Sequence, residues 1–190
     1  MERENPMSDK EKKSEPSPED KGVYLFMSEV SQETCKDLIS FILTKSWSSP
    51  RPKSLQIIIT SPGGDLAAAF AVIDIMKGCP IPVHTTGLGQ IASAGFMMFI
   101  AGEKGHRVLT PNTSIMSHQF SWGSWGKEHE LVAVGREFEL TTERMINHYK
   151  KCTGLNEAKI RQFLLPATDV YLGAREAKKL GICDTVKEFK

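Results

Sequence analysis

The stretch LQIIITSPGGDLAAAFAVIDIM, residues 55–76, contains in order a β-branched apolar run, a glycine turn and an alanine-rich segment. The first part, Leu55–Thr60, has the composition of a buried strand. The pair Gly63-Gly64 provides a tight turn that needs positive φ, and Leu66–Met76 is predicted to be a helix that packs closely on a sheet. With a strand predicted at Val83–Thr86, the stretch completes one βαβ unit, which predicts a mostly parallel sheet.

The alternation of strand and helix patterns continues on both sides of this unit. Further strands are predicted at Val23–Phe26, Arg107–Leu109 and Thr113–Met116, and helices after an N-cap at Ser31, from near Ser93, at Asn156–Phe163 and within a last strand–helix–strand over 169–186. The Gly-rich segment GLGQ, residues 87–90, is predicted to be a turn before the helix near Ser93. The length and pattern predict one α/β domain over residues 22–190.

The longest periodic segment, Lys127–Lys151, predicts an amphipathic helix. Its apolar positions recur at three- and four-residue steps and are Leu131, Val134, Phe138, Met145 and Tyr149. A domain of this size rarely needs so long a helix for its own core. We therefore expect the helix to protrude and to bury part of this face against another copy of the chain.

Residues 1–21 differ in composition from the rest of the chain. They carry many charged side chains of both signs and have methionine as their only apolar residue, which predicts a disordered tail. Met7 is an alternative translational start.

Composition and charge bound the class of protein. A formal net charge of +1 gives no electrostatic reason to bind nucleic acid or a membrane surface. No apolar run approaches the roughly 18 residues of a membrane span. The four cysteines are widely spaced, without CxxC or Cys/His clusters, which predicts neither a disulfide framework nor a metal site. We therefore expect a soluble, cytoplasmic protein.

Four segments carry residues suited to acyl transfer: SPGGD at 61–65, GQIASAG at 89–95, SIMSHQF at 114–120 and TDVYLGAREA at 168–177. In this order and spacing they resemble the ClpP family of serine peptidases, and the resemblance covers residues 22–186. It implies a ClpP/crotonase-like α/β fold of repeated βαβ units with a long protruding handle helix. It also implies a serine-type endopeptidase.

Ser93 follows a Gly-rich segment and is flanked by small residues, so its hydroxyl can be exposed at a helix N-terminus that favours developing negative charge. Taken alone, such a serine is more often a simple N-cap. His118, taken alone, is more often a structural histidine, although histidine is the commonest general base. The resemblance implies that Ser93 is the nucleophile and His118 the general base. The histidines at 84, 106, 129 and 148 are predicted to be structural or surface groups.

Asp169 precedes a short apolar strand pattern, and on its own is equally a capping residue. The resemblance implies that it orients His118, in preference to Asp184 and Asp65. The same resemblance implies an oxyanion hole made by the backbone amides of Gly64 and Ala94. Ala94 stands where the family usually has methionine, which leaves the amide in place and reshapes the nearby pocket.

The resemblance also implies an assembly, namely heptameric rings stacked in pairs around peptide substrates. The chain itself would need no cofactor, and ATP would enter only through an AAA+ unfoldase of the ClpX, ClpA or ClpC type. The charged residues 1–21 depart from the apolar N-terminal hairpin that engages the unfoldase in the family, which weighs against that partner. Trp122 and Trp125 also depart from the family pattern. They either contact substrate or the opposite ring, or pack on their own subunit.

Three rival functions stay open on the sequence alone. One is a non-catalytic ring subunit that needs a companion, against which the intact Ser, His and Asp argue. Another is an acyl-CoA enzyme of the crotonase fold, which needs no such set of residues. The third is a virus-type capsid-maturation peptidase of ClpP-like sequence.

Overall fold

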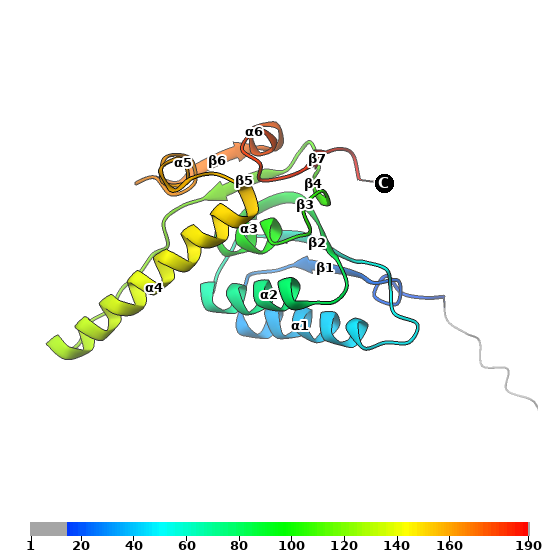
Figure 1. Ribbon diagram of the computed structural model, residues 1–190, viewed down its shortest axis with the longest axis horizontal. Helices are drawn as coiled ribbons and strands as arrows, with labels where there is room; N and C mark the ends of the chain where they lie inside the picture. Colours follow the sequence, from blue (N-terminus) through cyan, green and yellow to red (C-terminus); the bar gives the residue numbers. More distant parts are fainter. Residues whose placement is uncertain (1–14, 190) are drawn as a thin grey trace, which may run out of the picture.

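A mostly parallel, seven-stranded sheet forms the centre of the computed structural model, which describes residues 15–189 (Figure 1). The strands pair in the order β1-β2-β3-β4-β7, and β5 pairs with β3 and β6. The pairs described are parallel except for β5–β6, which is antiparallel. The strands are β1 (Val23–Met27), β2 (Leu55–Ser61), β3 (Val83–Ala92), β4 (Arg107–Leu109), β5 (Ser114–Ser117), β6 (Val170–Gly173) and β7 (Thr185–Val186).

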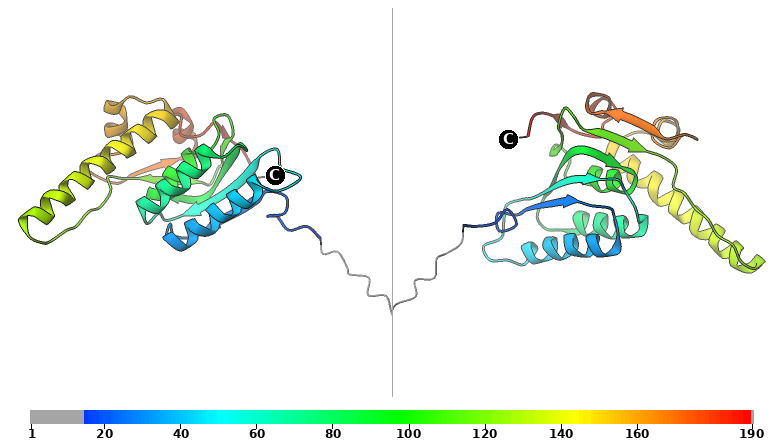
Figure 2. Two further views of the ribbon diagram at one scale, coloured as in Figure 1. Left: turned by 60° about the horizontal axis from the view of Figure 1, so that its bottom comes forward. Right: turned by 180° about the vertical axis from the view of Figure 1, so that it is seen from behind.

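The helices mostly alternate with the strands, as the βαβ pattern predicted, except that β4 and β5 are consecutive and two helices follow them before β6. They are α1 (Gln32–Ser46), α2 (Leu66–Gly78), α3 (Ser93–Ile100), α4 (Glu128–Thr153), α5 (Glu157–Phe163) and α6 (Ala174–Lys179). Helix α1 packs beside α2, α2 beside α3, and α3 beside α4, and Figures 1 and 2 show α1 and α2 together on one face of the sheet. Every residue of α3 after Ser93 is buried, so this helix forms the middle of the core.

Three helix ends have well-defined caps, of which the one at Ser31 was predicted from the sequence. The side chain of Ser31 accepts a hydrogen bond from the Thr34 amide, as predicted, and Asp65 accepts from the amides of Ala67 and Ala68 at the start of α2. Gly154 has the left-handed conformation that ends α4. These caps fix where α1 and α2 begin and where α4 ends.

The prediction of a turn at GLGQ, residues 87–90, is wrong, because β3 continues through it to Ala92. The segment is a bulged strand. Its pairing with β2 steps from Ile59↔Gly87 to Ser61↔Ile91, so β3 holds extra residues there. A side chain at Gly87 would collide with those of Ile91 and Leu109. The glycine is therefore explained by close packing within a sheet, not by a turn.

Helix α4 divides into two halves of different burial. Met145 and Tyr149 in the C-terminal half are buried, whereas Leu131 and Phe138 in the N-terminal half are exposed. Figure 1 shows this half of α4 extending away from the body of the domain. The apolar face predicted from the sequence is thus partly core and partly uncovered surface.

Part of the predicted disordered tail is described by the structure. Residues 15–21 lead into a turn in which the amides of Lys21 and Gly22 donate to the carbonyls of Ser17 and Glu19. The remainder, residues 1–14, lies outside the described residues. Within the described part of the chain, no helix is long and apolar enough to cross a membrane.

Candidate active site

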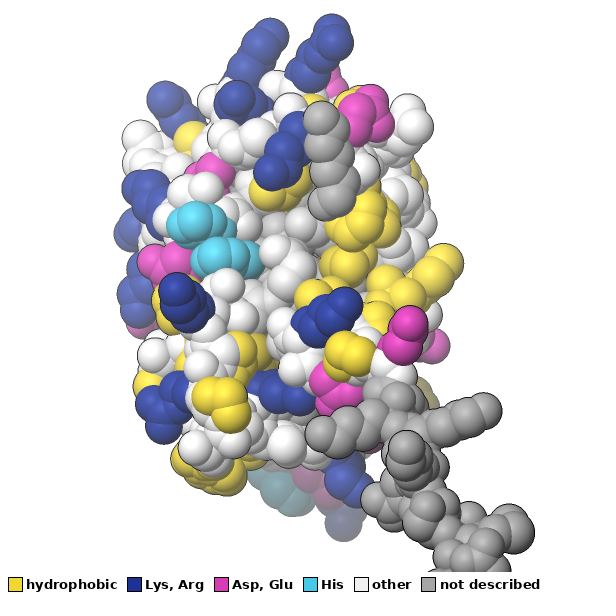
Figure 3. Space-filling model, turned by 90° about the vertical axis from the view of Figure 1, so that its right-hand side faces the viewer, with side chains coloured by type: hydrophobic (Ala, Val, Ile, Leu, Met, Phe, Trp, Pro, Cys, Tyr) yellow, Lys and Arg dark blue, Asp and Glu magenta, His cyan; other side chains and the backbone are white. Residues whose placement is uncertain are grey.

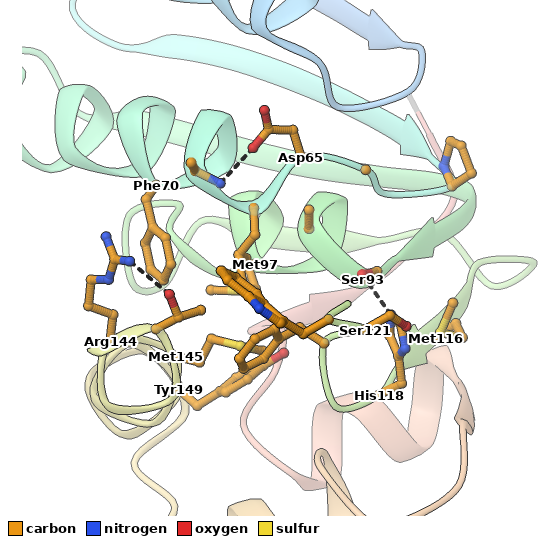
Figure 4. Close-up of a pocket in the computed structure, with 18 of the residues that line it drawn as sticks. Asp65, Phe70, Ser93, Met97, Met116, His118, Ser121, Arg144, Met145 and Tyr149 are labelled. Carbon is orange, nitrogen blue, oxygen red and sulfur yellow. Dashed lines mark hydrogen bonds between the residues drawn. The ribbon is translucent and has the colours of Figure 1, made fainter. Parts of the chain in front are cut away.

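Two strands of the sheet end side by side, and each is followed by a residue of the predicted site. β3 and β5 run parallel, and their last pair joins Ala92 to Met116. Because the carboxyl ends of parallel strands meet at one edge of a sheet, Ser93 and His118 come to the same edge. The Nε2 atom of His118 lies 2.8 Å from the Oγ atom of Ser93 (Figure 4). The two side chains are within hydrogen-bond distance.

Ser93 has a backbone conformation that is rare for a residue with a side chain. Its φ is 51°, and among residues 15–189 it is the only non-glycine residue with positive φ. Such conformations cost about 1–3 kcal/mol and persist where the surrounding structure fixes them. The N-cap position of α3 is taken by Ala92, without a side-chain hydrogen bond. The interpretation of Ser93 as a simple N-cap is therefore wrong.

The Gly63-Gly64 turn lies directly against the start of α3. Both glycines have positive φ, 96° and 141°, as predicted. A Cβ atom on Gly63 would lie 2.7 Å from the Cβ of Ser93 and 3.3 Å from the amide nitrogen of Ala94. The absence of a side chain at Gly63 therefore allows the turn to approach Ser93.

The backbone pairing of Gly64 sets the direction of its amide. Gly64 forms a parallel bridge with Val30, in which the Val30 amide donates to the Gly63 carbonyl at 2.8 Å and the Asp65 amide donates to the Val30 carbonyl at 2.7 Å. The residue between these bonds turns its own N–H to the opposite side, which is the side of β3. Ala94 lies in the first turn of α3, where amides have no partner within the helix.

Asp169 is brought to His118 by strand pairing. In the antiparallel β5–β6 pair, Ser117 is opposite Val170, so the next position places Asp169 across from His118. The Oδ1 atom of Asp169 lies 3.8 Å from the Nδ1 atom of His118, which is longer than a hydrogen bond. The side chain of Asp169 is 55% exposed, against 24% for His118. The two side chains are close at the edge of the site and form an ion pair only when His118 is protonated.

Asp184, the alternative acid, forms an ion pair with Arg107 and not with His118. Its carboxylate pairs with Arg107 at 2.7 Å and accepts hydrogen bonds from the amides of Gly105 and Arg107. Burial alone would raise the pKa of Asp184, but the hydrogen bonds and charge of Arg107 outweigh it, so this pKa lies below its ordinary value. Asp65, the other alternative, caps α2.

A cleft of about 550 Å³ opens beside Ser93 and His118. Its walls are mainly apolar and come from segments far apart in the sequence (Figure 4). The larger apolar side chains that line it are those of Phe70, Met97, Met116, Phe120, Trp122, Met145 and Tyr149. Burial raises the pKa of Tyr149 to about 12, so its hydroxyl stays protonated. The cleft can take an apolar side chain next to the Ser93 hydroxyl.

The two tryptophans have different surroundings. Trp122 lines the cleft and makes an edge contact with Phe120. Trp125 is 93% exposed. Trp122 thus packs on Phe120 of its own subunit and also lines the cleft, so both alternatives remain for it, and Trp125 is uncovered in the single chain.

Sequence reasoning missed the contacts that hold the His118 segment. The Ser117 hydroxyl donates to the Leu164 carbonyl at 2.6 Å, and the side-chain amide of Gln119 donates to the Leu165 carbonyl at 3.1 Å. These bonds flank His118 and bind it to the loop that leads to Asp169. The only signal in the sequence was the pair of polar residues on either side of the histidine.

The other histidines lie away from Ser93. His148 is buried, its Nε2–H donates to the Met97 carbonyl at 2.9 Å, and burial lowers its pKa to about 4. His84 and His106 stack with ring centroids 3.9 Å apart, and Figure 3 shows two touching histidines at the surface. Burial, followed by the charge of His106, lowers the pKa of His84. Their prediction as structural or surface groups is confirmed.

Comparison with known proteins agrees with this fold. A family model described as Clp protease matches residues 19–190. Among solved structures, a point mutant of ClpP1 from Listeria monocytogenes is similar with a TM-score of 0.79 and 28% sequence identity, over 90% of this chain and 94% of that one. With the predicted fold thus confirmed over nearly the whole length, the chain belongs to the Clp protease family.

Proposed function

We propose that this chain is a serine endopeptidase that cleaves short peptides and unfolded polypeptides. The observation that carries the proposal is the 2.8 Å contact between Ser93 Oγ and His118 Nε2. In a neutral His118 with its proton on Nδ1, Nε2 accepts the Ser93 proton as Oγ attacks the substrate carbonyl. The protonated ring then returns that proton to the leaving amine. Water repeats the sequence on the acyl-enzyme and releases the acid product.

The amides of Gly64 and Ala94 would bind the oxyanion that forms on the substrate carbonyl. Support comes from the cleft that Gly64 and Ala94 line together with Ser93, and from the direction of the Gly64 amide. Preorganised backbone donors of this kind stabilise charge as it develops, and loss of one donor costs on the order of 10²–10³ in rate. Because both donors are backbone groups, the alanine at position 94 does not remove one.

Asp169 would stabilise the protonated His118 and hold its proton on Nδ1. The 3.8 Å contact supports this role. Its exposure means that solvent screens the interaction, so the contribution is smaller than that of an enclosed carboxylate.

The assembly proposed for this activity is a pair of stacked heptameric rings that enclose the sites. The uncovered apolar side chains of the α4 half that extends from the domain support an interface there; they are Leu131, Val132, Phe138 and Leu140. No cofactor would be needed by the chain itself. Folded substrates would require an AAA+ unfoldase, which would bring the ATP requirement.

The test is peptide cleavage combined with active-site labelling. Wild-type protein should cleave fluorogenic peptides that place an apolar residue before the scissile bond, and a fluorophosphonate should label it at Ser93. Ser93→Ala should abolish both while leaving the circular dichroism spectrum unchanged, because only a hydroxyl is removed. Labelling that persists in Ser93→Ala would reject the nucleophile assignment.

A further inference from the structure

An ion pair closes the end of the cleft that lies opposite Ser93 and His118. Figure 4 shows Arg144 and Phe70 at this end, with Met97 between them and Ser93. The Nη2 atom of Arg144 donates to Glu137 Oε1 at 2.6 Å and to Thr141 Oγ1 at 2.8 Å. All three α4 residues line the cleft. The polar end is therefore built on one helix.

The spacing on α4 holds this group together. Residues 137, 141 and 144 follow one another at steps of four and three, so they share one face of the helix. The Thr141 hydroxyl, which is buried, donates to Glu137 Oε1 at 3.1 Å. The guanidinium carbon of Arg144 lies 5.0 Å from the centre of the Phe70 ring, within the range of a cation–π contact. Arg144 thus joins α4 to α2 across the cleft.

The charges of Arg144 and Glu137 cancel. Among the described residues, the one other acidic side chain in the lining already accepts hydrogen bonds from backbone amides. Besides Glu137 and Arg144, the charged lining residue is Asp65, whose Oδ1 accepts the amides of Ala67 and Ala68. His118 lies at the other end, beside Ser93. The far end of the cleft, beyond Met97, is consequently polar but carries no net charge from the Arg144–Glu137 pair.

We propose that the Arg144–Glu137 pair determines the side-chain specificity of this cleft by keeping its far end neutral. The cleft then favours a long uncharged side chain on the residue that supplies the scissile carbonyl, and disfavours Lys and Glu alike. This inference rests on the proposed function, in which a peptide binds beside Ser93. Either partner of the pair, left alone, gives the far end of the cleft a net charge of known sign, while the Asp65 carboxylate is the same in both cases.

Two charge-neutralising variants test the proposal in opposite directions. Arg144→Gln leaves the Glu137 carboxylate unpaired and should favour Lys in the peptide, whereas Glu137→Gln leaves the guanidinium and should favour Glu. Both partners are about half exposed, so the ratio of kcat/KM for Lys and Glu peptides should move by about fivefold in each direction. The shift should shrink at high salt, because the Debye length falls from about 30 Å at 0.01 M to about 3 Å at 1 M.

The chain offers a matched control on the same helix. Arg136 pairs with Glu139 at 3.0 Å, is exposed, and does not line the cleft. Arg136→Gln removes the same charge from α4 and should leave the Lys/Glu ratio at the wild-type value. Circular dichroism checks that each variant is folded.

The measurement uses three peptides that differ only in Leu, Lys or Glu before the scissile bond, and it has two readouts. One is kcat/KM, and the other is the dissociation constant by calorimetry in a Ser93→Ala background. Opposite shifts of the Lys/Glu ratio in the two variants support the proposal. Equal changes for all three peptides, or a shift in Arg136→Gln as large as in Arg144→Gln, overturn it.

The two readouts also separate the inference from the proposed function. If the wild-type protein binds the peptides without cleaving them, and the dissociation constants shift in opposite directions, the peptidase function fails while the specificity role stands. If it cleaves them with an unshifted ratio in the variants, only the specificity role fails. If no peptide is bound or cleaved, the inference is overturned as well.

Discussion

The Oδ1 atom of Asp169 lies 3.8 Å from His118 Nδ1, whereas Nε2 of the same ring lies 2.8 Å from Ser93 Oγ. The base is thus closer to the nucleophile than to the acid. Loss of an enclosed triad acid costs roughly 10⁴ in kcat. Because Asp169 is half exposed, Asp169→Asn should cost clearly less than this, and less than His118→Ala. Either change combined with Ser93→Ala should add little, since the three residues act as a unit.

Steady-state kinetics of the single and double variants measures this order. Asp184→Asn serves as the comparison, because it breaks the ion pair with Arg107 and should lower thermal stability. Equal losses in Asp169→Asn and His118→Ala would show that the acid contributes fully. No loss in Asp169→Asn would remove it from the mechanism.

Gly63→Ala should lower both activity and stability. The added Cβ would lie 2.7 Å from that of Ser93, at a backbone φ of 96° that side chains rarely adopt. Gly135→Ala is the matched control, since it lies within α4 and a Cβ there meets nothing within 4 Å. That variant should raise stability by up to about 1 kcal/mol and leave peptide cleavage unchanged. A Gly63→Ala protein with wild-type kinetics would contradict the close approach.

Stability should fall in acid because of His148. Its pKa in the folded chain is about 4, while the unfolded value is near 6.5, so between these pH values the unfolded chain binds a proton that the folded chain does not. Each pH unit in this window is worth about 1.4 kcal/mol, which makes the loss about 3 kcal/mol from pH 7 to pH 4. Above pH 7 this contribution is constant.

Urea unfolding at several pH values measures the effect, and His148→Gln isolates it. Glutamine keeps a donor for the Met97 carbonyl but does not titrate, so the variant should show a shallower decline of the unfolding free energy. Parallel curves for the two proteins would place the acid sensitivity elsewhere, for example at His84.

Charge on the uncovered half of α4 should disrupt assembly without unfolding the chain. Phe138 is 46% exposed and packs against Phe120, whereas Met145, two turns later, is 4% exposed. Phe138→Glu should therefore remain helical by circular dichroism and sediment as a smaller species. Met145→Glu should unfold, because it buries a charge in the core. A wild-type protein that sediments as a folded monomer at micromolar concentration would refute the interface.

Local pattern was sufficient for most elements of the fold. The βαβ unit around SPGGD, the Ser31 cap and the long helix over Lys127–Lys151 all follow from local propensity and period. The segment 87–90 did not, because Gly87 packs against Ile91 of its own strand and Leu109 of β4, and Gly89 has the positive φ of 60° within a bulged strand. Turn and bulge glycines look alike in a single sequence.

The site could be predicted only in part, for a related reason. Ser93 and His118 were identified by resemblance, and their 2.8 Å contact depends on β3 and β5 ending together. Asp169 lies close to His118 because of the antiparallel register of β5 and β6. The cleft joins α2 to α4, so the pairing of Arg144 with Phe70 had no signal along the chain.

The bulge in β3 makes this part of the chain sensitive to insertions and deletions. Side chains alternate between the two faces of a strand, so a shift of one residue sends every later side chain to the opposite face. Between Gly87 and Ser93 the strand already holds extra residues relative to β2. Removing or adding one of them would turn the Ser93 hydroxyl away from His118, and it would also displace the buried side chain of Ile91 and the buried helix α3. The position of the Ser93 hydroxyl therefore depends on the number of residues in this segment. A deletion here would lower activity more than most substitutions would.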